Sequence, residues 1–266
     1  MNEISLEIRR GIALIRFERP ERMNVFSPGM IEGLGEYYRR CDADDAVRVV
    51  VLSGSGAAFC AGADLSDAAV FTERPDVPPV SSCPLSIQAW DVRKPVIAAC
   101  NGHAIGVGLG IALQCDMRIV ALEGKYGLLQ NRRGVVADFG VEYLLPRLLG
   151  FERAFELLVR GLRLDGAEAA AWGLASRAVP GAEVLPLAME IAADMAQNCS
   201  PLVMGMHKRL LWRALDMPRQ ELVSLETRAL AHSMRRPDAL EGGLAWTQKR
   251  PPDWQPLREK DWPDFL

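Results

Sequence analysis

Several features that mark other classes of protein are scarce in this sequence. The 266 residues contain only three histidines, which lie far apart, so no spacing typical of metal ligands is present and we expect no metal site. The six cysteines form no CxxC pair, and several lie in apolar runs, which favours reduced, buried thiols in a cytoplasmic protein. The net charge is only −3 (31 basic against 34 acidic residues), which gives no general attraction for nucleic acid.

Long apolar segments are absent as well. No uncharged stretch approaches the ~20 apolar residues that a membrane span needs, so we expect no membrane partner. The first ten residues, MNEISLEIRR, carry charges where a secretion signal needs an apolar run, and we therefore expect a cytoplasmic location. The remaining composition, 49% apolar and 24% charged residues, is typical of a soluble globular protein with one large domain or one domain and an appendage.

Alternating strand and helix patterns predict an α/β core. Residues Ile4–Ile8 and Ile12–Phe17 alternate apolar and polar side chains around a two-residue turn, which is typical of a hairpin. Ser27 and Pro28 provide an N-cap and a first-turn proline for a helix to about Cys41. Further strands are expected at Val47–Ser53, Pro95–Cys100 and Met117–Val120, and further helices at Pro84–Arg93, at Phe139–Leu149 and, after the capping box Asp165–Glu168, at Ala169–Trp172.

The pattern changes near residue 200. From Ser200 and Pro201 to about Lys249 the sequence predicts helices only, so we divide the chain into a core, residues 1–200, and a C-terminal helical region, residues 201–266. Within the core, Ser66–Pro84 is rich in proline, serine and acidic residues. A loop of this length in a compact domain is usually functional or mobile, the alternative being a solvated loop without a role.

Two stretches rich in small residues provide the clearest functional signal. Asn101–Asp116, NGHAIGVGLGIALQCD, leads from an apolar strand through glycines into an apolar helix, and Ala57–Leu65, AAFCAGADL, is a second tight loop after a strand. Glycine lets a backbone approach a ligand closely, and backbone N–H groups from two such loops form an oxyanion hole for a carbonyl that becomes an enolate. The alternative is two glycine-rich turns that merely pack closely.

Three motifs together resemble the crotonase (enoyl-CoA hydratase/isomerase) superfamily: GSGAAFCAGADL, RKPVIAACNGHAIGVGLGIALQCDMRI and KYGLLQNRRGVVADFGVEYLLPRLLG. The similarity extends from about Arg19 to Trp254. It implies a spiral of ββα units followed by a C-terminal helical region used in trimer packing, and hence a homotrimer or a dimer of trimers. It also implies an acyl-CoA thioester substrate, with coenzyme A entering as part of the substrate and no separate cofactor.

The resemblance also assigns roles to individual residues. The two oxyanion N–H donors fall on Ala63 and Val107, and a valine is acceptable there because the donor is the backbone. Arg22 falls where the family contacts coenzyme A. Trp246 and Lys249 fall where it contacts the adenine, often from a neighbouring subunit, the alternative for Trp246 being the core of the last helix. The remaining residues expected to contact substrate lie in the two loops and after them: Ala61, Asp64, Leu65, Gly106, Gly108, Gly110 and Gln130.

The acid and base positions depart from the family pattern. Hydratases of the family carry glutamates where this sequence has Gly110 and Gln130, and neither replacement exchanges protons near neutral pH. Gly110 is also expected to widen the pocket. The segment around Asp138 resembles the dienoyl-CoA isomerase branch, which has an active-site aspartate at this offset. The match is partial, because that branch also keeps two further acids, at the positions of Gly110 and Gln130. Asp138 is therefore either a base with a raised pKa or only the N-cap of the following helix. Glu142 is expected on that helix's surface, the alternative being that it faces the pocket.

Three functions remain open from the sequence. We favour an acyl-CoA enzyme that shifts an enoyl or dienoyl double bond, because a 1,3-shift needs only one base and Asp138 provides it. The second is other enolate chemistry on the same fold, either hydrolysis of a C–C bond or an atypical hydration. The third is a catalytically silent acyl-CoA binding protein that kept the oxyanion hole and lost the acids.

Overall fold

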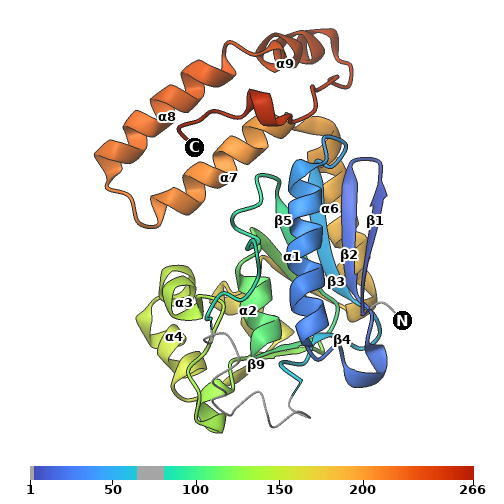
Figure 1. Cartoon of the computed structure of the whole chain (residues 1–266), viewed down its shortest axis with the longest axis vertical. Helices are drawn as coiled ribbons and strands as arrows, with labels where there is room; N and C mark the ends of the chain where they lie inside the picture. Colours follow the sequence, from blue (N-terminus) through green and yellow to red (C-terminus); the bar gives the residue numbers. More distant parts are fainter. Residues whose placement is uncertain (1–2, 65–80) are drawn as a thin grey trace.

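The computed structural model describes residues 3–64 and 81–266 (Figure 1). Leu65 and most of the expected loop Ser66–Pro84 lie outside the described residues. The described chain forms a core of two sheets with helices around them, and a set of helices at the C-terminal end that extends away from this core.

The larger sheet has six strands. Its first two strands run antiparallel to each other, and every other pair of neighbouring strands runs parallel. They lie in the order β1 (Ile4–Arg9), β2 (Ile12–Phe17), β3 (Val49–Gly54), β5 (Val96–Cys100), β7 (Met117–Ala121) and β10 (Arg177–Val179). The predicted hairpin is confirmed: β1 and β2 pair antiparallel, and Arg10 and Gly11 both have positive φ, which fits the tight turn between them.

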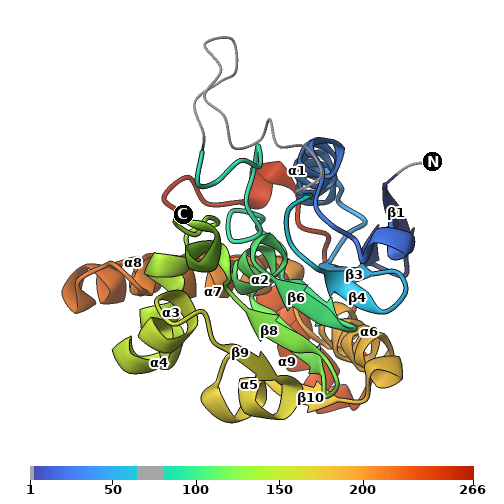
Figure 2. The same ribbon diagram turned by 90° about the horizontal axis from the view of Figure 1, so that it is seen from below.

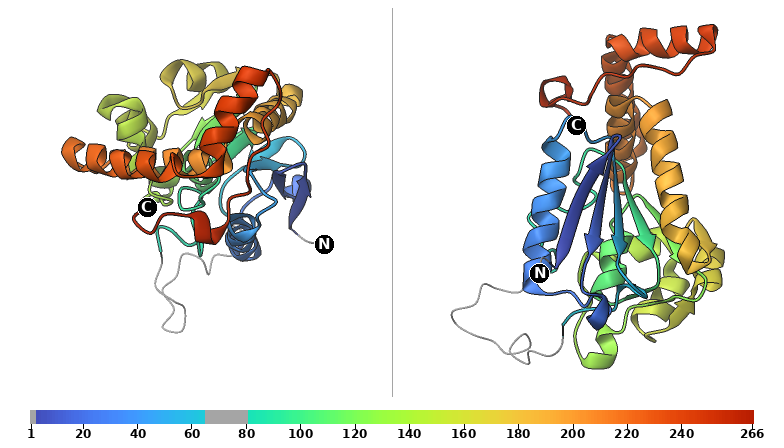
Figure 3. Two further views of the ribbon diagram at one scale, coloured as in Figure 1. Left: turned by 90° about the horizontal axis from the view of Figure 1, so that it is seen from above. Right: turned by 90° about the vertical axis from the view of Figure 1, so that its right-hand side faces the viewer.

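One long helix covers each face of this sheet, as the right-hand view of Figure 3 shows. On one face lies α1 (Pro28–Ala43), whose N-cap Ser27 accepts a hydrogen bond from Met30 N, as predicted. On the other face α6 (Gly181–Asn198) packs alanines against the alternate side chains of the central strands. Because both faces are covered, the β3 and β5 side chains are all buried, which explains their continuous apolar runs.

The second sheet lies below the first and carries the glycine-rich stretch (Figure 2). Its strands are β4 (Ala58–Cys60), β6 (His103–Ile105), β8 (Lys125–Gly127) and β9 (Arg163–Asp165), in that order. Directly after β6 the chain enters α2 (Val107–Leu113). The helices α3 (Val141–Leu149), α4 (Phe151–Leu158) and α5 (Gly166–Trp172) complete this end of the molecule, and α5 begins with the predicted capping box.

The C-terminal helices are α7 (Pro201–Ala214), α8 (Arg219–Ser233) and α9 (Pro237–Gln248). A buried ion pair attaches α7 to the core: Lys208 Nζ lies 2.8 Å from Asp116 Oδ2, and Trp212 Nε1 donates to the other oxygen of Asp116. In the part of the chain that the structure describes, no helix is long and apolar enough to cross a membrane.

Three local expectations are corrected by the structure. Residues 84–93 form bends and turns and no helix. The helix predicted from Phe139 begins at Val141. Phe139 and Gly140 both have positive φ (59° and 69°), which a right-handed helix does not allow, so neither residue belongs to it. Ser200 precedes α7 as predicted, but its hydroxyl donates to Asp238 instead of capping the helix.

Candidate functional site

The backbone N–H of Ala63, in the loop after β4, has no hydrogen-bond acceptor among the described residues. Phe26 N donates to Gly62 O (2.7 Å) and Asp64 N donates to Phe26 O (3.1 Å), so residues 62 and 64 turn these groups toward Phe26. Ala63, the residue bridged to Phe26, therefore directs its own N–H to the opposite side, because successive backbone groups of an extended chain alternate. This side faces the start of α2.

The start of α2 presents the second N–H. Gly106 precedes the helix with a φ of +55°, which favours glycine, and Val107 is the first helical residue, whose N–H has no partner within a helix. The two loops are in close contact: a β-carbon on Gly108 would lie 2.2 Å from Cys60 O, and one on Gly62 would lie 3.3 Å from Ile105 O. Only glycine fits at position 108, and these contacts hold the loop after β4 against the start of α2.

An ion-pair cluster fixes the residue next to Ala63. The guanidinium of Arg22 binds both oxygens of Asp64, at 2.8 and 2.9 Å, and Arg19 Nη2 lies 3.3 Å from Asp64 Oδ2. The Asp64 side chain is 16% exposed, so this fork is partly shielded from solvent. Arg22, which the sequence places on coenzyme A, is thus bound here to the loop that carries the first donor.

Asp138 and Gln130 form a pair beside the second donor loop. Gln130 begins the short 3-10 helix η3 (Gln130–Arg133) and is 9% exposed. Its Nε2 donates to Asp138 Oδ1 (3.3 Å), and its amide lies 3.6 to 3.7 Å from where a β-carbon on Gly106 would be. The Gln130 amide therefore lies between the Asp138 carboxylate and Gly106, the residue before Val107.

The surroundings of Asp138 raise its pKa. Partial burial has the largest effect, because it disfavours the charged carboxylate, and the negative charge of Glu142 adds to it. Hydrogen bonds from the Asp138 backbone N–H and from Gln130 oppose the increase without cancelling it. The interpretation of Asp138 as a helix cap is wrong: α3 has Gly140 as its N-cap residue and no side-chain cap bond.

Gly110 has a different consequence from the one expected. A β-carbon at this position would lie 2.9 Å from the β-carbon of Phe139, which is 1% exposed and meets the ring of Phe26 edge-on. The space left by the missing side chain is thus filled by Phe139, and the prediction of a wider pocket at this position is wrong. No pattern in the sequence indicates this contact, since it depends on the positive φ of Phe139.

A cavity of about 330 Å³ opens beside Gln130. Apolar side chains of the segment before α3 and of the end of α4 form most of its wall, and Glu142 also lines it: Leu128, Val135, Val136, Ala137, Leu158 and Val159 are the apolar members. Glu142 is exposed, as expected, and it also lines this cavity, which is the alternative that the sequence left open for it. Its charge acts on Asp138.

Two of the predicted residues lie far from this group. Trp246 and Lys249 belong to α9 and its C-cap, at the end of the molecule opposite to α3 and α4 (Figure 1). Trp246 is 87% exposed, so its interpretation as core of the last helix is wrong. Within one chain, the structure packs the loop that carries Ala63 against the start of α2 and places the Gln130–Asp138 pair beside Gly106. It does not bring the two residues of α9 to this place.

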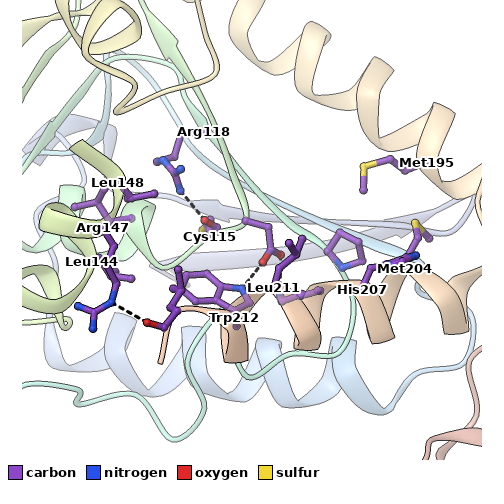
Figure 4. Close-up of a pocket in the computed structure, with 15 residues that line it drawn as sticks. Cys115, Arg118, Leu144, Arg147, Leu148, Met195, Met204, His207, Leu211 and Trp212 are labelled. Atoms are coloured by element: carbon purple, nitrogen blue, oxygen red, sulfur yellow. Dashed lines mark hydrogen bonds and ion pairs between the residues drawn. The ribbon is translucent and has the colours of Figure 1, made fainter. Parts of the chain in front are cut away.

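A second cavity, of about 470 Å³, lies between α7 and the core (Figure 4). Leu144 and Leu148 of α3 and Leu211 of α7 give it an apolar wall, and the Asp116–Trp212 hydrogen bond lies at its edge. None of the residues that the sequence assigns to the site lines this cavity, so its place is the junction between the C-terminal helices and the core.

Known proteins match this chain over nearly its whole length. The family described as enoyl-CoA hydratase/isomerase matches residues 7–257. An enoyl-CoA hydratase of Alternaria alternata is 34% identical over 247 residues, 92% of this chain and 83% of that protein. A carnitinyl-CoA dehydratase of Proteus mirabilis is 33% identical over 258 residues, 95% of this chain and 98% of that protein.

Solved structures agree with the sequence relatives. The crystal structure of a probable enoyl-CoA hydratase/isomerase from Mycobacterium abscessus has a TM-score of 0.93 and 41% identity, and the match covers 97% of this chain and 100% of that chain. An enoyl-CoA hydratase from Bacillus anthracis has a TM-score of 0.88 and 30% identity, over 95% and 99%. The predicted α/β fold of the crotonase type is thus confirmed, and the chain belongs to the enoyl-CoA hydratase/isomerase family.

Proposed function

We propose that this member of the family is an acyl-CoA isomerase that moves a double bond along the acyl chain, with Asp138 as the proton shuttle. The observation that carries the proposal is the carboxylate of Asp138, partly buried and hydrogen-bonded to Gln130, whose amide packs on Gly106 beside the Val107 donor. The two positions that carry glutamates in hydratases are Gly110 and Gln130, which supply no second acid.

The reaction uses the backbone donors first. The thioester oxygen of a 3-enoyl-CoA accepts hydrogen bonds from Ala63 N–H and Val107 N–H, which stabilise negative charge as it develops. Asp138 takes a proton from C2, and the electrons of that C–H bond form the dienolate. The double bond then moves to C2–C3 as the enolate collapses and Asp138 returns its proton to C4.

The raised pKa of Asp138 suits this role. A carboxylate with an ordinary pKa is a weak base near neutral pH, and burial makes it stronger without removing its ability to release the proton again. The cavity of about 330 Å³ beside Gln130, with its apolar wall, offers room for the acyl chain beyond the reacting carbons.

An atypical hydration is the second candidate. Its support is that several relatives are named hydratases or dehydratases, and that Glu142 lines the cavity beside Gln130 and interacts with Asp138. In that reaction Asp138 and Glu142 would share the acid and base roles that two glutamates have in the family.

Two substrates separate these functions. The isomerase function predicts that trans-3-hexenoyl-CoA is converted to the conjugated 2-enoyl-CoA, followed by the absorbance of the conjugated thioester, and that Asp138→Asn lowers this rate by about 10²–10⁴. With 2-hexenoyl-CoA in water, hydration should be much slower than isomerisation and insensitive to Glu142→Gln. Fast hydration that Glu142→Gln abolishes would replace the first function by the second.

A further inference from the structure

Only one of the two polar atoms of the Gln130 amide makes a hydrogen bond among the residues that the structure describes. Its Nε2 donates to Asp138 Oδ1, whereas its Oε1 is buried and has no hydrogen-bond partner among the residues that the structure describes. A buried acceptor without a partner costs free energy, so its retention beside the donor loop points to a function in the reaction cycle.

We propose that Gln130 is a positioning residue that holds Asp138 in both of its protonation states, by donating from Nε2 to the carboxylate and accepting at Oε1 from the carboxylic acid after the amide turns over. The inference rests on the proposed function, in which Asp138 carries a proton between two carbons of the substrate. No bond to Gln130 is made or broken, because the proton moves only between substrate carbon and Asp138.

An amide is the one side chain that fits both states equally well at this place. It carries a donor and an acceptor on the same carbon, and a half-turn about its last bond exchanges them. A glutamate at position 130 would place two carboxyl groups about 3 Å apart, which would have to share one proton and would titrate as a coupled pair. A methionine would leave Asp138 with its own backbone N–H and no side-chain partner.

The other groups that face Asp138 are few among the described residues. Glu142 approaches from α3, and the thiol of Cys83 lies close enough for Asp138 to raise its pKa. The backbone beside Cys83 is fixed against the same segment, since Phe139 N donates to Ser82 O (2.5 Å). Neither Glu142 nor Cys83 donates a hydrogen bond to a carboxylate in the way that Gln130 does.

The test compares Gln130→Met and Gln130→Glu with the wild-type enzyme. Loss of a hydrogen bond to the charged form raises the pKa of a base, so Gln130→Met should move the acidic limb of the pH–kcat profile upward by about one pH unit or more. The kcat at neutral pH should fall about tenfold or more while KM changes less than about threefold. Gln130→Glu should move the limb further in the same direction.

Asn131→Leu is the matched control. Asn131 is the next residue of the same 3-10 helix and also uses its amide, but it donates to Val159 O and not to Asp138. This variant removes an amide from the loop and should leave the acidic limb where it is. A thermal unfolding curve of each variant shows that the comparison is made between folded proteins.

A direct readout separates this inference from the proposed function. With ¹³C-labelled aspartate, the carboxyl resonance of Asp138, assigned by its absence in Asp138→Asn, should titrate at higher pH in Gln130→Met than in the wild type. If it does and the enzyme moves no double bond, the isomerase function fails and the positioning of Asp138 stands. If the resonance titrates at the same pH in both proteins, or if Asn131→Leu shifts it equally, the positioning role of Gln130 is wrong.

Discussion

At the scale of single residues, the site depends on where side chains are missing as much as on where they are present. Gly108 and Gly62 allow the two donor loops to touch, and Gly110 admits Phe139 between α2 and the segment before α3. The sequence predicted that the glycines of these loops allow close approach of a ligand, with close packing of the two turns as the alternative, and the first two contacts are of the packing kind. It did not predict the third, since a phenylalanine with positive φ leaves no pattern in the chain.

Substitution of Gly110 tests the contact with Phe139. A β-carbon would lie 2.9 Å from the β-carbon of Phe139, so Gly110→Ala should lower the free energy of unfolding by about 1–3 kcal/mol. Gly243→Ala on α9 is the control, since nothing lies within 4 Å of its added carbon, and it should leave stability unchanged or raise it slightly. Urea unfolding of both variants measures the difference, and equal stabilities would refute the contact.

The pH dependence of stability tests the environment of Asp138. Burial raises the pKa of this carboxyl in the folded protein above its ordinary value, so the ionised form costs folding free energy. Stability from this group is fully present below the ordinary pKa of about 4 and is lost as pH rises through the folded pKa. Asp138→Asn should therefore be more stable than the wild type at pH 7, and the difference should vanish near pH 4. A less stable variant at pH 7 would contradict the burial of the charge.

At the scale of elements, sequence patterns located five strands of the larger sheet and several helices, because each of these has a local cause. They did not predict β10, the four short strands of the second sheet, or the helices α4 and α6. The hairpin, the Ser27 cap and the capping box at Asp165 depend on residues close in the chain, and all three were predicted correctly. Residues 84–93 were predicted wrongly as a helix, and the packing role of Phe139 was missed, because both depend on contacts between distant segments.

The ion pair between Lys208 and Asp116, which attaches α7 to the core, also joins residues far apart in the chain, and its contribution to stability is testable. Lys208 is 5% exposed and pairs with Asp116, which is 22% exposed, so Lys208→Met leaves a partly buried charge without its cation. We expect a loss of about 3 kcal/mol in the free energy of unfolding. Lys125→Met removes an exposed lysine from β8 and should have little effect. Similar melting temperatures for the two variants would show that the ion pair contributes little.

At the scale of the whole molecule, the C-terminal helices expose large apolar side chains. Leu211, Leu230, Met234, Leu240 and Trp246 are each at least 60% exposed. We propose, as the family resemblance implies, that other copies of the chain cover these residues in a homotrimer or a dimer of trimers.

Sedimentation equilibrium tests this proposal, and it should give the mass of three or six chains. The double variant Leu230→Glu with Met234→Glu should lower the mass to that of one chain, because it places charges in an apolar interface. Glu226→Gln, an exposed change on the same helix α8, should leave the assembly intact. A monomeric wild-type protein would overturn the proposal.

The proposed reaction requires Asp138 to exchange a proton with an acyl group held by Ala63 and Val107. Exchange of the α-protons of butanoyl-CoA into deuterated water, followed by NMR, tests it most directly, because exchange needs only the oxyanion hole and a base and not the true substrate. We expect exchange by the wild-type enzyme and a rate lower by about 10²–10⁴ in Asp138→Asn, with the affinity for butanoyl-CoA nearly unchanged. Equal exchange by the two proteins, or none by the wild type, would contradict it.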